Sequence, residues 1–154
     1  QSSTRRGGVA SVAAVSTMEV WVREAPRVFI HDADGDWTEL STGWRRTLRL
    51  SAPNLSQARR RRDRLPRDVS VILDVTVSVA DDSRAALAAA AVLDHPHTVR
   101  YAGTVDGLAG LVADLYTAGV ADGVTLLPAA SGTDLRSHAV AALPRIHRLL
   151  RIPA

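Results

Sequence analysis

The sequence predicts an α/β fold built from parallel β/α units. The run 69–79 holds five Val, one Ile and one Leu, with Asp74 as its only charge, which is typical of a strand buried on both faces of a parallel sheet. An Ala-rich helical segment follows it, and a second apolar strand at 123–127 lies between two further helical patterns. Strands that alternate with helices favour a parallel sheet. Because 154 residues with 46% hydrophobic content can bury one core, we expect a single domain over 1–154.

The first fifty residues predict short elements. Gly7 and Gly8 precede apolar residues at near-helical spacing, which favours a glycine loop that opens into a short helix within 1–18. The runs 20–22 and 27–30 are expected to be short strands. The apolar residues of 37–53, which include Trp44, Leu48 and Leu50, could face a core from a helix or a strand, so the type of this segment stays open.

An acidic segment at 31–36 has two interpretations. Asp32, Asp34 and Asp36 resemble the start of a calcium-binding loop. That loop needs glycine where Trp37 stands and glutamate where Gly43 stands. We therefore predict a hairpin turn here.

The segment after residue 53 predicts helices with recognisable starts and ends. Asn54 is expected to cap a helix that ends near Pro66. Residues 81–83 are expected to cap an Ala-rich helix over 85–93, and 94–103 is expected to be a loop.

Two more helices are predicted near the carboxyl terminus. Thr104 is expected to cap one that ends at Gly119, and Thr133 to cap one in which Pro144 introduces a kink. The apolar faces of these two helices comprise Val105, Leu108, Val112, Leu115 and Tyr116 in the first, and Leu135, Ala139, Ala142, Ile146 and Leu149 in the second.

Composition excludes several kinds of chemistry. All nineteen basic residues are Arg, so the chain has no lysine for a Schiff base or a phosphate-binding loop. The absence of cysteine excludes thiol nucleophiles, disulfides and Cys-ligated metals. No apolar run is long enough to span a bilayer, and the chain opens without the apolar core of a secretory signal, so we expect a soluble, cytoplasmic protein.

The charge pattern does not favour nucleic-acid binding. The net charge is +3, and one dense cluster comprises Arg59, Arg60, Arg61, Arg62, Arg64 and Arg67. Asp63 interrupts this cluster, and no aromatic residues that could stack on bases are interleaved with it. We interpret the cluster as a solvated helix end and expect no nucleic-acid partner.

Neither the histidines nor the tryptophans define a site. His95 and His97 share a loop but lack the spacing and companion ligands of a metal centre, so no metal site is predicted. His138 lies beside the apolar face of the last helix, where a hydrogen-bonded core histidine is expected. The three tryptophans are expected to form a small aromatic core. No residue can be given a catalytic role.

Three motifs resemble a known family: 71–82 with its Ala-rich helix, Ala102-Gly103-Thr104-Val105, and Ala118-Gly-Val-Ala-Asp-Gly-Val-Thr-Leu-Leu-Pro128. They are similar to the C-terminal part of luciferase-like flavin- or deazaflavin-dependent oxidoreductases. The resemblance covers roughly 55–154, whereas 1–54 is weakly matched. It implies the C-terminal portion of a TIM barrel, and an incomplete one, because a whole barrel takes about 250 residues. The chain departs from the family at Val105, where the family often has Pro.

The resemblance also implies a cofactor and a candidate site. Ser2, Ser3 and Thr4 follow Gln1 in a segment similar to the loop with which the family binds a cofactor phosphate, although the Ala-Gly pair between the Gln and the serines is missing. The implied cofactor is FMN or a deazaflavin, and a frayed Ser-rich terminus is the competing interpretation.

Two functional hypotheses follow. The chain is a fragment or subunit of a luciferase-like flavin-dependent oxidoreductase or monooxygenase that acts on a small molecule, or it is a non-catalytic truncated barrel. In both hypotheses an incomplete barrel leaves strand edges open, so we expect self-association or a partner subunit.

Overall fold

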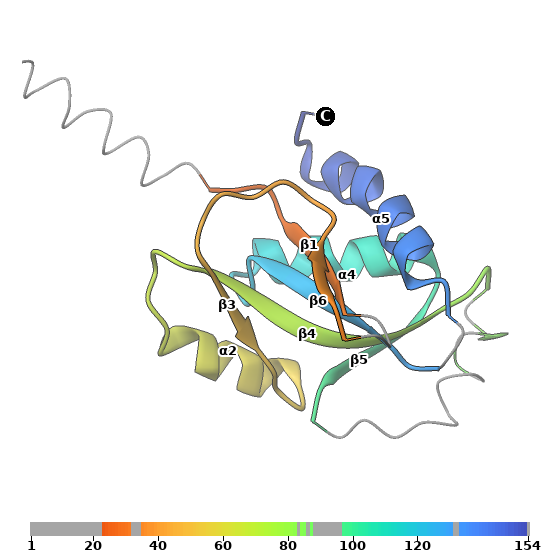
Figure 1. Ribbon diagram of the computed structural model, residues 1–154, viewed down its shortest axis with the longest axis horizontal. Helices are drawn as coiled ribbons and strands as arrows, with labels where there is room; N and C mark the ends of the chain where they lie inside the picture. The colour runs from red at the N-terminus through yellow and green to blue at the C-terminus, as the bar shows by residue number, and fades with distance from the viewer. Residues whose placement is uncertain are drawn as a thin grey trace, which may run out of the picture.

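The computed structural model describes residues 23–31, 35–82, 84, 85, 87, 97–130 and 133–153. This part of the chain has an α/β fold, in which a curled, six-stranded mixed sheet packs against helices (Figure 1). The strands are β1 (Arg27–His31), β2 (Trp37–Glu39), β3 (Thr47–Leu50), β4 (Ser70–Val79), β5 (Val99–Gly103) and β6 (Gly123–Pro128), and the helices are α2 (Leu55–Asp63), α4 (Val105–Thr117) and α5 (Leu135–Leu150).

The sheet is largely parallel, with β4 at its centre. The strand order is β2-β1-β6-β4-β3, and β5 also pairs with β4. Of the six strands in the described ranges, β2 alone is antiparallel, in a hairpin with β1. β3 pairs with the first half of β4 and β5 with the second half, both on the side opposite β6. In a complete β/α barrel each strand pairs with the next one along the chain, whereas here β4 lies between β5 and β6.

One face of the sheet forms the hydrophobic core with the helices. Leu73, Val75 and Val77 of β4 point to this face together with apolar residues of the neighbouring strands, and α2, α4 and α5 all contribute to the same cluster. The opposite face carries the alternate residues of the strands, among them Asp74 and Thr125. The parallel strands therefore place apolar side chains under the helices and mixed side chains on the opposite face.

Several predicted elements are confirmed. The central strand is β4, and it is buried on both faces. Asn54 caps α2 and Thr104 caps α4, each through its side-chain oxygen. Gly119 follows α4 with φ of +73°, as a C-terminal glycine should. His31 pairs with Trp37, which confirms the hairpin across 31–36.

Other predictions were wrong. Residues 99–103 form β5, not a loop, because β4 supplies a partner for a short segment that contains Arg and Gly. Asp134, not Thr133, caps α5. Leu149 is 57% exposed and Trp44 is 73% exposed, so neither belongs to the core. Trp37 does pack, in a stack on Phe29.

Some predictions fall outside the described residues. These are the glycine loop and helix within 1–18, the strand at 20–22 and most of the helix over 85–93. At the start of that helix, the Asp82 carboxylate accepts a hydrogen bond from the Ala85 N–H at 2.8 Å, which is the expected capping contact. Among the described helices, none is both long and apolar enough to cross a membrane.

Candidate functional site

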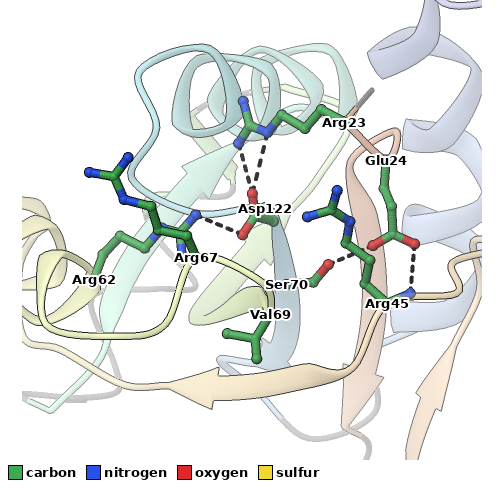
Figure 2. A pocket seen from close by; sticks show the side chains of 8 residues that line it. All are labelled: Arg23, Glu24, Arg45, Arg62, Arg67, Val69, Ser70 and Asp122. Carbon is green, nitrogen blue, oxygen red and sulfur yellow. Dashed lines mark hydrogen bonds and ion pairs between the residues drawn. The ribbon is translucent and has the colours of Figure 1, made fainter. Parts of the chain in front are cut away.

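A charged pocket lies at the amino-terminal ends of the parallel strands. Because parallel strands start at the same edge of a sheet, the residues just before β1, β3, β4 and β6 meet there, beside the end of α2. The pocket has a volume of about 260 Å³ and is lined by Arg23, Glu24, Arg45, Arg62, Arg67, Val69, Ser70 and Asp122 (Figure 2). Four guanidinium groups thus share the lining with two carboxylates.

Asp122 joins three segments at one side of the pocket. Its Oδ1 accepts from Arg23 Nη2 at 2.9 Å, and its Oδ2 lies 3.0 Å from Arg62 Nη2. Oδ2 also accepts from the Val71 N–H at 2.8 Å, and the Asp122 N–H donates to the Val71 carbonyl at 2.8 Å. The carboxylate therefore ties α2 and the segment before β1 to the start of β4.

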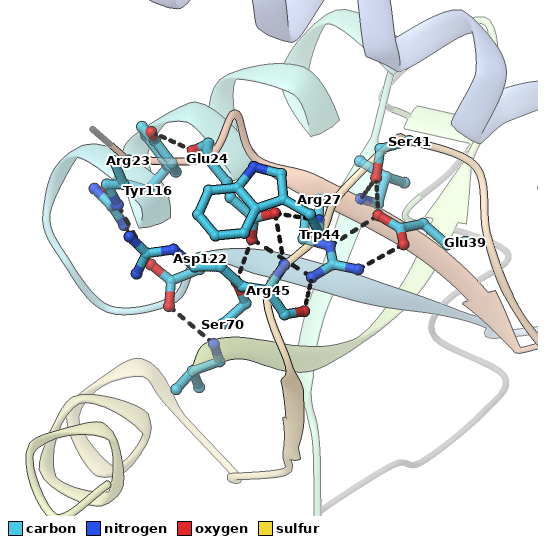
Figure 3. Close-up of polar contacts among 12 residues, drawn as sticks. Arg23, Glu24, Arg27, Glu39, Ser41, Trp44, Arg45, Ser70, Tyr116 and Asp122 are labelled. Atoms are coloured by element: carbon cyan, nitrogen blue, oxygen red, sulfur yellow. Dashed lines mark hydrogen bonds and ion pairs between the residues drawn. The ribbon is translucent and has the colours of Figure 1, made fainter. Parts of the chain in front are cut away.

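Glu24 organises the other side of the pocket (Figure 3). It accepts hydrogen bonds from the Ser70 hydroxyl and from the backbone N–H groups of Trp44 and Arg45. Burial raises the pKa of Glu24, but these hydrogen bonds and the charge of Arg27 outweigh burial and hold the pKa below its ordinary value. The carboxylate is therefore ionised near neutral pH.

Arg27 continues this network behind the pocket. Its guanidinium is buried and binds Glu39 through two contacts, Nε–Oε2 at 2.8 Å and Nη2–Oε1 at 2.6 Å. Its Nη1 donates to the Arg45 carbonyl at 2.7 Å. The hydrogen bonds to Glu39 raise the pKa of Arg27. Burial raises the pKa of Glu39, but the hydrogen bonds from Arg27 and Ser41 outweigh burial. The pKa of Glu39 is therefore below its ordinary value.

Tyr116 closes the network on the helix side. Its hydroxyl donates to the Glu24 carbonyl at 2.6 Å, and the Arg23 guanidinium lies 3.7 Å from the ring centroid. Burial raises the pKa of the Tyr116 phenol, against the opposing effect of Arg23. Arg23 is thus held by an aromatic ring and a carboxylate together.

A second polar group lies near the middle of the sheet, on the face opposite α2, α4 and α5, and extends to the end of β1. Arg49 Nε donates to Asp74 Oδ1 at 3.0 Å, and its Nη2 lies 3.1 Å from His31 Nδ1. Since arginine can only donate, Nδ1 of His31 is the acceptor. The Trp37 indole N–H donates to the Thr125 hydroxyl at 2.9 Å.

An aromatic stack lies beside this polar group. Trp37 stacks on Phe29 with a centroid separation of 4.3 Å, and Arg49 lies 5.4 Å from the Trp37 centroid. Trp37 is 37% exposed, so part of its ring faces solvent. This face therefore combines a partly exposed tryptophan ring with the Arg49–Asp74 ion pair and the His31 imidazole.

Some of the candidate site residues predicted from the sequence lie in the described part of the chain, and others lie outside it. Ser2, Ser3 and Thr4 lie outside the described residues, as do Asp32, Asp34 and His95. Within the described ranges, no group of three or more His, Asp or Glu side chains could hold a metal ion. His138 is half-buried, and its buried Nδ1 has no hydrogen-bond partner among the described residues, contrary to the expected hydrogen-bonded core histidine.

The arginine cluster does not form one surface. Arg62 and Arg67 line the pocket, whereas Arg60 and Arg61 make hydrogen bonds to Ser56, Gln57 and the Ser51 carbonyl at the surface. Consecutive residues of a helix are about 100° apart around its axis, so a run of four cannot share a face. Sequence reasoning grouped these arginines correctly as a helix end but missed that Arg62 turns inward to Asp122.

Comparison with known proteins does not assign the chain to a class. No known protein-family model matches it, and no curated protein sequence is significantly similar to it. The fold and the two polar groups are therefore the observations on which a function has to be argued.

Proposed function

We propose that this chain is the C-terminal β/α part of a luciferase-like flavin- or deazaflavin-dependent oxidoreductase. Its curled, largely parallel sheet, with the described helices α2, α4 and α5 packed on the same face, supports this proposal because it has the layering of a barrel section. Thr104, which belongs to one of the motifs that carry the resemblance, caps α4, and this helix start supports the proposal as well.

The observation that carries the proposal is the group of polar and aromatic side chains on the face opposite α2, α4 and α5, which reaches the carboxyl-terminal end of β1 at His31. Ligands of parallel α/β proteins bind at this end of the sheet. The partly exposed Trp37 ring offers a flat apolar contact of the kind a flavin ring system requires, and Arg49 offers a positive charge beside it. A bound flavin would supply the hydride or oxygen chemistry, and the chain would bind and orient it.

The incomplete sheet supports a requirement for further strands. In the described part of the chain, β5 pairs with β4 on one side only. A barrel section with an open edge needs a longer chain, a partner subunit or a second copy to cover it. The second candidate, a non-catalytic association module, is favoured by this same open edge.

A titration of the purified chain with FMN, followed by flavin fluorescence, tests the first candidate. We expect saturable binding that weakens about tenfold in Arg49→Gln, because a charged partner is lost. The triple variant Ser2→Ala, Ser3→Ala, Thr4→Ala tests the expected phosphate loop in the same assay. Ser56→Ala, which removes a hydroxyl at an exposed position of α2, is the control.

Light scattering on the same samples separates the two candidates. A folded dimer or larger species without flavin binding would reject the oxidoreductase proposal and retain the association module. A monomer that binds neither FMN nor a deazaflavin would reject both.

A further inference from the structure

The charged pocket at the amino-terminal ends of the strands is not explained by the proposed function. A flavin would bind at the opposite, carboxyl-terminal end of the sheet. The pocket lies between the end of α2 and the segments that lead into β1 and β3 (Figure 2). It therefore calls for an explanation of its own.

The two carboxylates of the pocket are already engaged. Asp122 binds Arg23, Arg62 and the Val71 N–H. Glu24 accepts from the Ser70 hydroxyl and from two backbone N–H groups. Most of their acceptor sites are therefore occupied by contacts that hold the segments together, and few acceptor sites remain for further arginines.

Donor groups, in contrast, remain available. Arg23 uses its guanidinium on Asp122 and on the carbonyls of Tyr116 and Ala121. The Arg62 guanidinium makes one ion pair among the described residues, through Nη2 to Asp122. Arg67 lines the pocket and makes no ion pair or hydrogen bond within the described ranges. Arg62 and Arg67 therefore keep N–H donors that face a common space.

The charge of the pocket points to a dianion. Arg23, Arg62 and Arg67 share one carboxylate of the described lining, Asp122, which leaves two positive charges in excess. Guanidinium groups brought together without a counter-ion repel one another, and an anion between them removes that cost. A phosphoryl group of a monoester carries nearly two negative charges at neutral pH and has three oxygens that can accept from two arginines at once. A carboxylate has one charge and two oxygens, so it matches this pocket less well.

We propose that this pocket binds the phosphoryl group of a small molecule, with Arg62 and Arg67 as the donors. A pocket of about 260 Å³ has room for the phosphoryl group and a short attached chain. The aliphatic side chain of Val69 lines it beside the charged groups. A phosphoryl group from a mononucleotide, a sugar phosphate or free phosphate would be recognised by the same contacts.

Calorimetric titration of the full chain with inorganic phosphate, and separately with ribose 5-phosphate, tests the proposal. We expect saturable binding of both, weakened about tenfold in Arg67→Gln and in Arg62→Gln, because each loses a charged hydrogen-bond donor. Tighter binding of ribose 5-phosphate than of phosphate would identify a monoester as the ligand class, and equal binding would identify free phosphate. Arg64→Gln is the matched control, since Arg64 is an exposed neighbour that does not line the pocket.

Three outcomes would overturn the proposal. The first is the absence of saturable phosphate binding by the folded parent chain. The second is an equal loss of binding in Arg64→Gln and Arg67→Gln. The third is tight, salt-sensitive binding of a single-stranded oligonucleotide that depends on Arg64 as much as on Arg67, which would indicate a nucleic-acid surface.

Two features keep this test separate from other effects. Arg67→Gln breaks no contact among the described residues, so the test does not depend on Arg62→Gln remaining folded. Inorganic phosphate and ribose 5-phosphate lack a flavin ring, so they report on the pocket alone. FMN carries a phosphate monoester and can enter the same pocket, so FMN binding supports the flavin site only where Arg49→Gln weakens it and Arg67→Gln does not.

Discussion

Gly123 shows how one residue fixes the start of the sheet. A Cβ atom on Gly123 would lie 2.3 Å from the backbone carbonyl oxygen of Arg27, which is closer than real Cβ contacts. Backbone atoms cannot move aside as a flexible side chain can. Glycine is therefore required where β6 passes β1, and the neighbouring Asp122 can then bind the start of β4.

Gly123→Ala should destabilise the chain by about 2 kcal/mol or more, because β1 must shift away from β6. Gly110→Ala is the control: a Cβ there meets nothing within 4 Å. In the interior of α4, alanine should stabilise by up to about 1 kcal/mol. Urea unfolding of both variants measures the difference, and equal free energies of unfolding would contradict the predicted close contact.

Arg27 is the second residue on which the amino-terminal end of the sheet depends. Arg27→Met should cost about 3–5 kcal/mol, because it leaves Glu39 and Glu24 without their buried cation. Arg46→Met, at an exposed side chain close by, should change the free energy of unfolding by less than about 0.5 kcal/mol. Chemical denaturation measures both. If Arg27→Met lowers the free energy of unfolding no more than Arg46→Met does, the ion pairs of Arg27 with Glu24 and Glu39 do not stabilise the fold.

At the scale of the elements, helix caps are the contacts most directly readable from sequence. The Thr104 hydroxyl accepts from the Gly107 N–H at 3.2 Å at the start of α4. Thr104→Ala should therefore destabilise by about 1 kcal/mol. Thr117→Ala, at the exposed end of the same helix, removes the same hydroxyl without a cap and should cost nothing measurable. Thermal unfolding of both variants measures the difference. A similar fall in Tm in the two variants would argue against the capping role of Thr104.

Local signals predicted β1, β4, β6 and the described helices, left the type of the segment that holds β3 open, and missed β5. The apolar run of β4 and the caps Asn54 and Thr104 are properties of neighbouring residues, and they were read correctly. β3 and β5 exist because β4 offers hydrogen-bonding partners along one side. Such pairing depends on residues far apart in the chain, so neither composition nor periodicity shows it.

The candidate sites were harder to predict than the fold for the same reason. Arg23 and Asp122 are 99 residues apart in sequence yet lie 2.9 Å apart. No spacing rule connects them, although the Asp122-Gly123 turn was noticed through the family resemblance. The expected cofactor loop at Ser2, Ser3 and Thr4 stays a prediction.

At the scale of the whole molecule, the amino-terminal end of the sheet is held by ionised groups as well as by apolar packing. Glu24 connects the segment before β1 to β4 and to the segment before β3, and Glu39 holds Arg27. Both pKa values are lowered from 4.5 in the folded chain. Each carboxylate therefore binds fewer protons when folded than when unfolded at mildly acidic pH, and stability depends on pH accordingly.

The stabilisation from these two carboxylates should be fully present above about pH 4.5 and should be lost as the pH falls through their lowered folded-state pKa values. Urea unfolding between neutral pH and the acid range measures it. Glu39→Gln should be less stable than the parent at neutral pH, and the difference between the two should shrink as the pH falls below 4.5. Asp114→Asn, at an exposed position of α4, changes the net charge equally and separates that effect from the loss of the Arg27 contact. A difference between Glu39→Gln and the parent that stayed constant down to strongly acid pH would show that Glu39 does not hold the strand ends as an ionised group.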